Sequence, residues 1–289
     1  MLTFVHMKTY QQLWQSLTPL YDAGEAQAIV RTVLEVRYGM TFTDIICGKV
    51  NELSADKGIE LEKIIERLQK AEPVQYILGE TNFAGRTFHV APGVLIPRPE
   101  TAELCDWITE ESSHPERASS KYNILDICTG SGCIAITLAL NIPNSIVTGW
   151  DISDEALHIA KENTKTLGAS HVNIEHQDAL ALPLDNRKWD IIVSNPPYIC
   201  NKEKANMEKN VLEHEPSIAL FVPNEDPLRF YRAIAEYAST ALKPNGELYF
   251  EINPIYVEEM KQMLDDFHFS NIKVKKDMEG KERMMKTSR

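Results

Sequence analysis

The sequence from residue 97 onward alternates between short apolar runs and longer amphipathic runs, and this alternation constrains the fold most. The predicted strands are 123–128, 146–152, 172–176, 189–193, 247–252, 272–276 and 284–287, and the predicted helices are 133–140, 154–167, 227–242 and 257–267. Alternation of this kind predicts an open, mainly parallel sheet with helices on both faces. Only a short turn at 279–281 separates the last two strands, so these two must be antiparallel. The expected fold class is α/β, with a parallel sheet that ends in an antiparallel hairpin.

The residues before this region have a different pattern. Leu13, Leu17 and Leu20 recur at helical spacing, and strand signals are few. Ser54 precedes another helical run and is a candidate cap for it. We therefore expect a small helical domain over residues 1–80, a β-hairpin linker over 81–96 and a catalytic domain over 97–289.

Composition excludes several classes of protein. The formal net charge of −12 disfavours a general nucleic-acid binder, because phosphate contacts need clustered Lys and Arg. No apolar run approaches the ~20 residues that a membrane span needs. The five cysteines form no CxxC pair, which indicates reduced thiols in the cytosol and no metal site. We expect a cytoplasmic protein without a metal.

A glycine-containing turn follows the first predicted strand of the sheet. Gly130 and Gly132 permit close backbone approach, and Asp151 ends the next strand, where an acidic residue can accept both ribose hydroxyls of an adenosine. Position 135 is Ala and not a third glycine, which disfavours NAD and favours a single adenosine with a shorter appendage. S-adenosylmethionine fits that description, and Asp126 can receive its ammonium group directly or through water. The expected cofactor-binding residues are Asp126, Cys128, Thr129, Gly130, Ser131, Gly132, Asp151 and Asn195.

Each of these residues also has a purely structural interpretation. The glycines can form an ordinary tight turn between a strand and a helix. Asp151 can cap the following helix, although Ser153 can take that position instead.

The tetrapeptide Asn195-Pro196-Pro197-Tyr198 follows the fourth predicted strand. Two prolines end that strand and fix the backbone of the loop. The Asn195 side-chain oxygen and the Pro196 carbonyl can each accept one N–H of a planar amide or amine, and Tyr198 can stack on it. We predict catalytic roles for Asn195, Pro196 and Tyr198 and substrate binding by all four residues. The structural alternative is a Pro-Pro turn beside a buried tyrosine.

Several segments together resemble the release factor glutamine methyltransferases, the HemK/PrmC family. They are Pro73–Gly79, Phe83–Phe88, Val94–Thr101, Asp126–Cys133, Asn195–Ile199, Glu215–Leu220 and Asp277–Arg283. The resemblance implies a class I S-adenosylmethionine-dependent methyltransferase fold and methylation of the glutamine in the Gly-Gly-Gln motif of class I peptide-chain release factors, with S-adenosylhomocysteine as product. It also implies that the helical domain contacts the release factor, that Cys128–Gly132, Asp151 and Asn195 bind the cofactor, and that Asn195–Tyr198 hold the glutamine. We expect a monomer that binds neither nucleic acid nor a membrane.

The chain departs from the family pattern at a few positions. Cys128 replaces a glycine, so we expect its φ to avoid positive values. Ala179 replaces an aromatic residue near the adenine, Ala102 replaces a glutamate whose role can move to Glu103, and Asn253 replaces a glycine. None of these departures is expected to touch the acceptor loop.

Three alternatives remain open. The acceptor can be a glutamine of a ribosomal protein or, against the acidic charge, the N6 nitrogen of adenine in a nucleic acid. The third alternative is a non-catalytic binding module on a methyltransferase fold.

Overall fold

The computed structural model describes residues 8–113 and 121–289, which form two compact units. The first, which we call the helical unit, comprises the described residues up to Glu80 together with Glu208–His214. The second, the sheet unit, comprises the described residues of Thr81–Met207 and Glu215–Arg289. Residues 1–7 and 114–120, which fall within the predicted domain ranges, lie outside the described residues.

One apolar core holds the helical unit together. Its helices are Tyr10–Gln15 (α1), Ala23–Tyr38 (α2), Phe42–Ile46 (α3), Lys49–Glu52 (η1), Ala55–Leu68 (α4), Val74–Leu78 (α5) and Lys209–His214 (α9). Leu13 and Leu17 are buried in the core, but Leu20 is 41% exposed. Helix α1 ends at Gln15, so the predicted helical spacing does not continue to Leu20. Ser54 precedes α4 but makes no side-chain capping bond.

The sheet unit is built on a seven-stranded sheet in the order β10-β11-β9-β6-β3-β4-β5. The strands are Asn123–Ile127 (β3), Ile146–Asp151 (β4), Asn173–His176 (β5), Trp189–Ser194 (β6), Leu242–Glu251 (β9), Ser270–Lys276 (β10) and Glu282–Ser288 (β11). Strands β9, β6, β3, β4 and β5 are parallel, whereas β11 pairs antiparallel with both β9 and β10. The predicted parallel sheet with an antiparallel hairpin is confirmed.

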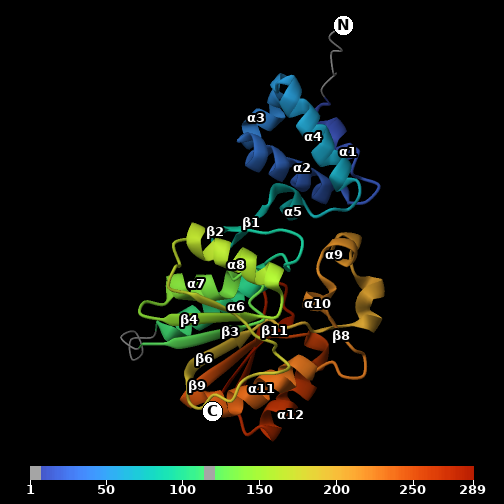
Figure 1. Ribbon diagram of the computed structural model, residues 1–289. Coiled ribbons are helices and arrows are strands. Elements are labelled where there is room, and N and C mark those ends of the chain that lie inside the picture. The colour runs from blue at the N-terminus through green and yellow to red at the C-terminus, as the bar shows by residue number, and fades with distance from the viewer. Residues whose placement is uncertain (1–7, 114–120) are drawn as a thin grey trace. The chain divides into compact units, whose positions relative to one another are not determined.

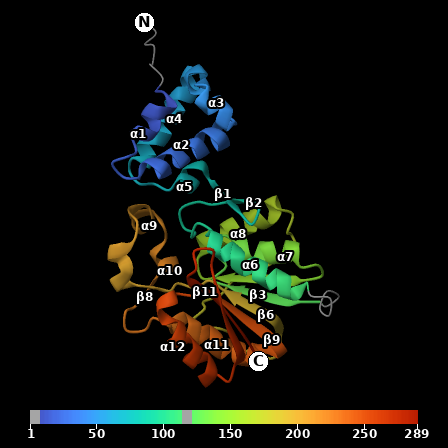
Figure 2. The ribbon, with the colours of Figure 1, turned by 180° about the vertical axis from the view of Figure 1, so that it is seen from behind.

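Helices cover both faces of this sheet. Helices Pro99–Ser112 (α6), Cys133–Asn141 (α7) and Asp154–Thr166 (α8) lie on one side, and Arg229–Ala241 (α11) and Val257–Asp266 (α12) lie on the other (Figures 1 and 2). A short helix, Pro254–Tyr256 (η3), leads into α12. The chain turns in opposite directions from β3 to β4 and from β6 to β9, and ligands of open α/β sheets bind at such a switch point.

The predicted hairpin at 81–96 contains strands Glu80–Phe83 (β1) and Arg86–His89 (β2). Its residues Phe83 and Phe88 meet edge to face with ring centroids 5.7 Å apart. Both rings are buried in the apolar cluster that also contains Leu104 of α6 and Leu138 of α7. The hairpin is therefore packed on the sheet unit through its aromatic side chains.

Some elements were not predicted. Helix α6 has Thr101, Leu104, Cys105 and Ile108 on one buried face, a helical spacing that was present in the sequence and was missed. No helix or strand was predicted between β6 and α11. This segment contains Ile199–Cys200 (β7), Asn201–Asn206 (η2), α9, Ser217–Leu220 (α10) and Phe221–Val222 (β8). These elements are too short to show a periodic pattern.

Candidate active site

The glycine-containing turn joins β3 to α7 with three residues in the left-handed region. Cys128 has a φ of 64°, Gly130 of 55° and Gly132 of 81°. The expectation that Cys128 avoids positive φ is wrong. Backbone bonds from Thr129 N to Trp150 O (2.9 Å) and from Gly132 N to Thr129 O (2.9 Å) hold the turn directly after this position. Their stabilisation offsets the cost of about 1–2 kcal/mol that a side chain incurs in this conformation.

Asp151 links the turn to the neighbouring strand. Its Oδ2 accepts the backbone N–H of Gly130 at 2.8 Å, and its Oδ1 accepts that of Ser153 at 3.0 Å. Ser153 is the cap of α8, since its hydroxyl accepts the N–H of Ala156 at 3.2 Å. Asp151 is therefore not the helix cap. Each carboxylate oxygen keeps a second lone pair, so the side chain can still accept two hydroxyl donors.

Asp126 lies beneath the turn and is fully buried. Its Oδ2 accepts the Thr129 hydroxyl at 2.5 Å and the Ala135 N–H at 3.1 Å. Its Oδ1 has no hydrogen-bond partner in the described part of the chain. Burial raises the pKa of Asp126 to about 7, because the charged form loses its hydration.

A cavity of about 330 Å³ opens beside the turn in the sheet unit. Of the predicted site residues, it is lined by Cys128, Gly130, Asp151, Asn195 and Pro197, but not by Asp126, Thr129, Ser131, Gly132, Pro196 or Tyr198. Apolar side chains complete the wall, among them Ala179, Leu180, Ile218, Phe221 and Phe230. A carboxylate beside apolar walls suits a nucleoside, whose ribose needs acceptors and whose base needs apolar contact.

Phe230 is relevant to Ala179, the position where the family has an aromatic residue near the adenine. Both residues line the cavity, and Phe230 is partly buried against the apolar cluster that contains Ala179. The guanidinium of Arg229 lies 5.6 Å from the centre of the Phe230 ring. The cavity thus has an aromatic wall residue from α11, although position 179 has none. No local pattern could have indicated this role, because in the sequence Phe230 is one more residue of an amphipathic helix.

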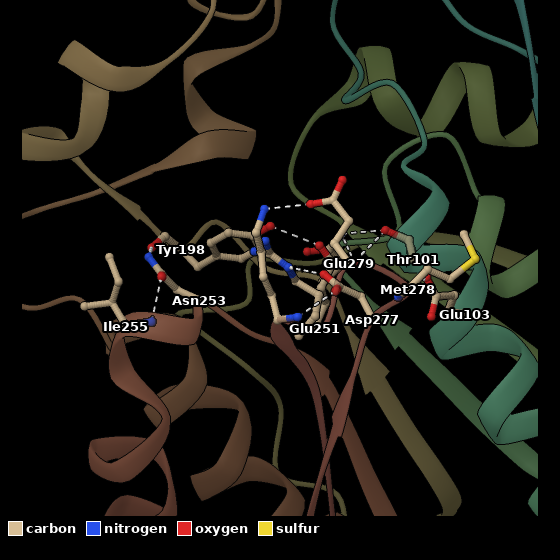
Figure 3. Close-up of polar contacts among 12 residues, drawn as sticks. Thr101, Glu103, Tyr198, Glu251, Asn253, Ile255, Asp277, Met278 and Glu279 are labelled. Atoms are coloured by element: carbon tan, nitrogen blue, oxygen red, sulfur yellow. Dashed lines mark hydrogen bonds and ion pairs between the residues drawn. The ribbon is translucent and has the colours of Figure 1, made fainter.

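The acceptor loop begins directly after β6, and its side chains meet a buried carboxylate. Asn195 donates through Nδ2 to Glu251 Oε2 at 3.0 Å and to Thr101 Oγ1 at 3.2 Å. The Tyr198 hydroxyl donates to Glu251 Oε1 at 3.0 Å, and that of Thr101 donates to Oε2 at 2.5 Å. Figure 3 shows Glu251 between Tyr198 and Thr101. Neither Glu251 nor Thr101 was predicted as a site residue, since both lie far along the chain from the loop.

The electrostatics of this cluster keep the tyrosine a hydrogen-bond donor. Burial raises the pKa of Tyr198 far above its usual value, and the neighbouring Glu251 raises it further. Burial also raises the pKa of Glu251 itself, against the hydrogen bonds from Thr101 and Tyr198 and the positive charge of Arg283. The Tyr198 hydroxyl therefore stays protonated at neutral pH.

Two departures from the family pattern have contacts near this site. Asn253 Nδ2 donates to the backbone carbonyl of Tyr198 at 3.2 Å, so the expectation that no departure touches the acceptor loop is wrong. A glycine at that position would have no side chain to make this bond. Glu103, beside Ala102, accepts the backbone N–H of Met278 at 3.2 Å and so joins α6 to the turn between β10 and β11 (Figure 3).

Another buried carboxylate organises the segment after α9. Glu215 accepts from the guanidinium of Arg98 at 2.6 Å and from the N–H of Ile96 at 3.2 Å. Ile218 and Phe221, which follow it, line the cavity. Glu215 thus ties the backbone at Ile96 and the side chain of Arg98 to the segment that lines the cavity.

Within residues 8–113 and 121–289, no helix is both long and apolar enough to cross a membrane. Among the same residues, no cluster of three or more His, Cys, Asp or Glu is arranged to hold a metal ion.

Comparison with known proteins places this geometry in context. A family model described as "PrmC N-terminal domain" matches residues 13–79, and one described as "Methyltransferase domain" matches residues 118–251. The release factor glutamine methyltransferase of Bacteroides thetaiotaomicron is 49% identical over 276 residues, which cover 95% of this chain and 97% of that protein. The protein of the same name from Flavobacterium psychrophilum is 42% identical over 285 residues, with 98% and 99% covered.

A solved structure shows the same fold. The 16S rRNA methyltransferase of T. thermophilus, in complex with AdoMet and guanosine, matches with a TM-score of 0.52 at 19% identity. The match covers 73% of this chain and 49% of that one. Together with the methyltransferase family model, it confirms the predicted class I methyltransferase fold.

Proposed function

The chain belongs to the release factor glutamine methyltransferase family, and from this premise we propose that it methylates the side-chain amide nitrogen (N5) of the glutamine in the Gly-Gly-Gln motif of class I peptide-chain release factors. The proposed donor is S-adenosylmethionine. A release factor is a translation factor, so the expected place of action is the cytoplasm. Both halves of the site lie in one chain, so we expect a monomer to suffice.

One observation carries the proposal. The Asn195 carboxamide turns its NH2 group toward Glu251 and Thr101, and the same residue lines the cavity beside the glycine-containing turn. Its Oδ1 is therefore available to accept a hydrogen bond. An acceptor at this place suits a substrate that offers N–H donors, as a glutamine amide does.

The lining of the cavity supports S-adenosylmethionine as the proposed cofactor. Asp151 can accept hydrogen bonds from the ribose hydroxyls, and Gly130 lets the backbone approach the cofactor closely. Phe230 and Leu180 offer apolar contact to the base. Asp126 is buried under the turn, so any interaction with the cofactor's ammonium group would be indirect. When bound, S-adenosylmethionine supplies an electrophilic methyl group on a sulfonium.

The residues of the acceptor loop would orient a weak nucleophile. An amide nitrogen is unreactive because its lone pair is delocalised into the carbonyl. Asn195 Oδ1 and the Pro196 carbonyl would each accept one N–H, which favours positive charge on nitrogen as the bond forms. Tyr198 would support the plane of the amide. No strong general base is needed, since the methylated nitrogen is acidic enough to lose its proton to water afterwards.

A labelling assay tests this function. The purified protein is incubated with methyl-labelled S-adenosylmethionine and, separately, a release factor, its Gly-Gly-Ala loop variant, a ribosomal protein and duplex DNA. We expect label only on the intact release factor. Equal label on the loop variant, or label on DNA, would refute the proposal.

A further inference from the structure

Glu251 occupies a place in the sheet from which it can reach the whole acceptor loop. It is the last residue of β9, it is 2% exposed, and it pairs in register with Met284 of β11. On the other side, Phe250 pairs with Ser194, the residue before Asn195. A side chain on a strand is held more precisely than one on a loop, so Glu251 is a well-fixed partner for the loop.

The chemistry of a carboxylate decides how Asn195 is oriented. An ionised carboxylate only accepts hydrogen bonds, so the asparagine must turn its NH2 group toward Glu251. If the Asn195 carboxamide were turned the other way, its Oδ1 would lie against the Glu251 carboxylate and the two oxygens would repel each other. Thr101 favours the same orientation of Asn195. Its hydroxyl proton is donated to Glu251, so its oxygen can only accept a hydrogen bond from Asn195. With Nδ2 fixed in this way, Oδ1 is the atom left for a substrate.

The same carboxylate holds the other end of the loop. Glu251 Oε2 accepts hydrogen bonds from Asn195 and Thr101, whereas Oε1 accepts one from the Tyr198 hydroxyl. The charged groups that act on Glu251 are Arg283 on β11, which stabilises the carboxylate, and Glu100 on α6, which opposes it. The first and last residues of the acceptor loop are thus bound to one buried group on a neighbouring strand.

We propose that Glu251 is the positioning residue that holds the Asn195 carboxamide with Oδ1 toward the substrate and locks Tyr198 beside it. This rests on the proposed function. Glu251 touches neither the cofactor cavity nor a reacting atom, so it acts through Asn195. Its loss is expected to lower the turnover rate and leave cofactor binding intact.

Glu251→Gln tests the proposal, with Glu247→Gln as its matched control. Glu247 is a buried carboxylate on the same strand that is 2.8 Å from Lys286 Nζ and accepts the Tyr249 hydroxyl at 3.0 Å, away from the acceptor loop. For both variants, kcat at saturating release factor, the Kd for S-adenosylmethionine and the thermal unfolding midpoint are measured. We expect Glu251→Gln to lower kcat about 100-fold with Kd within about threefold, and Glu247→Gln to keep kcat within about twofold.

A pair of compensating substitutions gives a result that is not expected if Glu251 has only a structural role. Asn195→Asp alone places two carboxylates against each other and is expected to be inactive. When Glu251→Gln is added, the introduced amide donates to one oxygen of the introduced aspartate, and the other oxygen again faces the substrate. We expect the double variant to exceed the single Asn195→Asp variant by about tenfold or more in kcat.

The outcomes separate the two hypotheses. Failure of the wild-type protein to methylate the release factor glutamine would refute the proposed function. An active wild type with a Glu251→Gln variant of equal kcat, or no gain in the double variant, would refute only the role of Glu251. Should Glu251→Gln not fold, Tyr198→Phe keeps the ring and removes one bond to Glu251. It is expected to lower kcat about tenfold, and an unchanged kcat would overturn the proposal.

Discussion

The two halves of the site follow neighbouring parallel strands, yet they are held in different ways. The glycine-containing turn after β3 is fixed through its own backbone N–H groups, which Thr129 donates to the Trp150 carbonyl and Gly130 donates to the Asp151 carboxylate. The acceptor loop after β6 is fixed by side chains, which reach Glu251 56 and 53 residues away in the sequence. The donor half therefore depends on backbone conformation, whereas the acceptor half depends on distant side chains. Substitutions in the two halves should therefore separate cofactor binding from turnover.

The largest expected effect comes from the acceptor half. Asn195→Ala removes the oxygen proposed to accept the substrate N–H, so we expect kcat to fall by about 1,000-fold while the cofactor Kd stays within about tenfold. Single-turnover kinetics and calorimetric titration measure the two quantities. A turnover rate equal to that of the wild type would refute the role of Asn195.

The donor half should show the reverse behaviour. Asp151→Ala removes the acceptor for Gly130 N–H and for the proposed ribose contact, so we expect the cofactor Kd to rise about 100-fold. At saturating cofactor, kcat should stay within about threefold. Asp22→Ala is the control, since it removes the side-chain cap of α2, which does not line the cavity, at a cost of about 1 kcal/mol in unfolding free energy but should leave Kd unchanged. If Asp151→Ala lowered only kcat, the inference that the donor half controls cofactor binding and the acceptor half controls turnover would be wrong.

A smaller effect is expected at the aromatic wall of the cavity. Phe230→Leu should raise the cofactor Kd about tenfold, because the aromatic contact with the base is lost. Phe267→Leu changes a partly buried phenylalanine that does not line this cavity and should not change Kd. Equal Kd values for both variants would exclude Phe230 as a substitute for the aromatic residue missing at Ala179.

The smallest effect concerns the acid beneath the turn. An acid whose pKa is higher in the folded chain binds more protons when folded, so the free energy of unfolding falls as pH rises from the unfolded pKa to the folded pKa. With the pKa of Asp126 at about 7, the free energy of unfolding should fall by about 1 kcal/mol between pH 6 and 7. Denaturant unfolding of the wild type and of Asp126→Asn measures this. The same pH slope in both proteins would rule out Asp126 as its source.

Local sequence patterns predicted the sheet and its closing hairpin, because strand alternation and short turns act over a few residues. They did not predict Glu251 as the partner of Asn195, since that contact exists only once β9 lies beside β6. The prediction for Cys128 failed for the same reason: contacts with β4 override its own preference for negative φ. The contact of Asn253 with Tyr198 also joins segments far apart in the sequence.

The most direct test of the whole account is to locate the methyl group on the substrate. A release factor treated with this protein and S-adenosylmethionine is digested, and the peptide that contains Gly-Gly-Gln is fragmented in a mass spectrometer. We predict one added methyl group on the glutamine side chain, present with the wild type and absent with Asn195→Ala. A methyl group on any other residue, or on that glutamine with both proteins, would contradict the account.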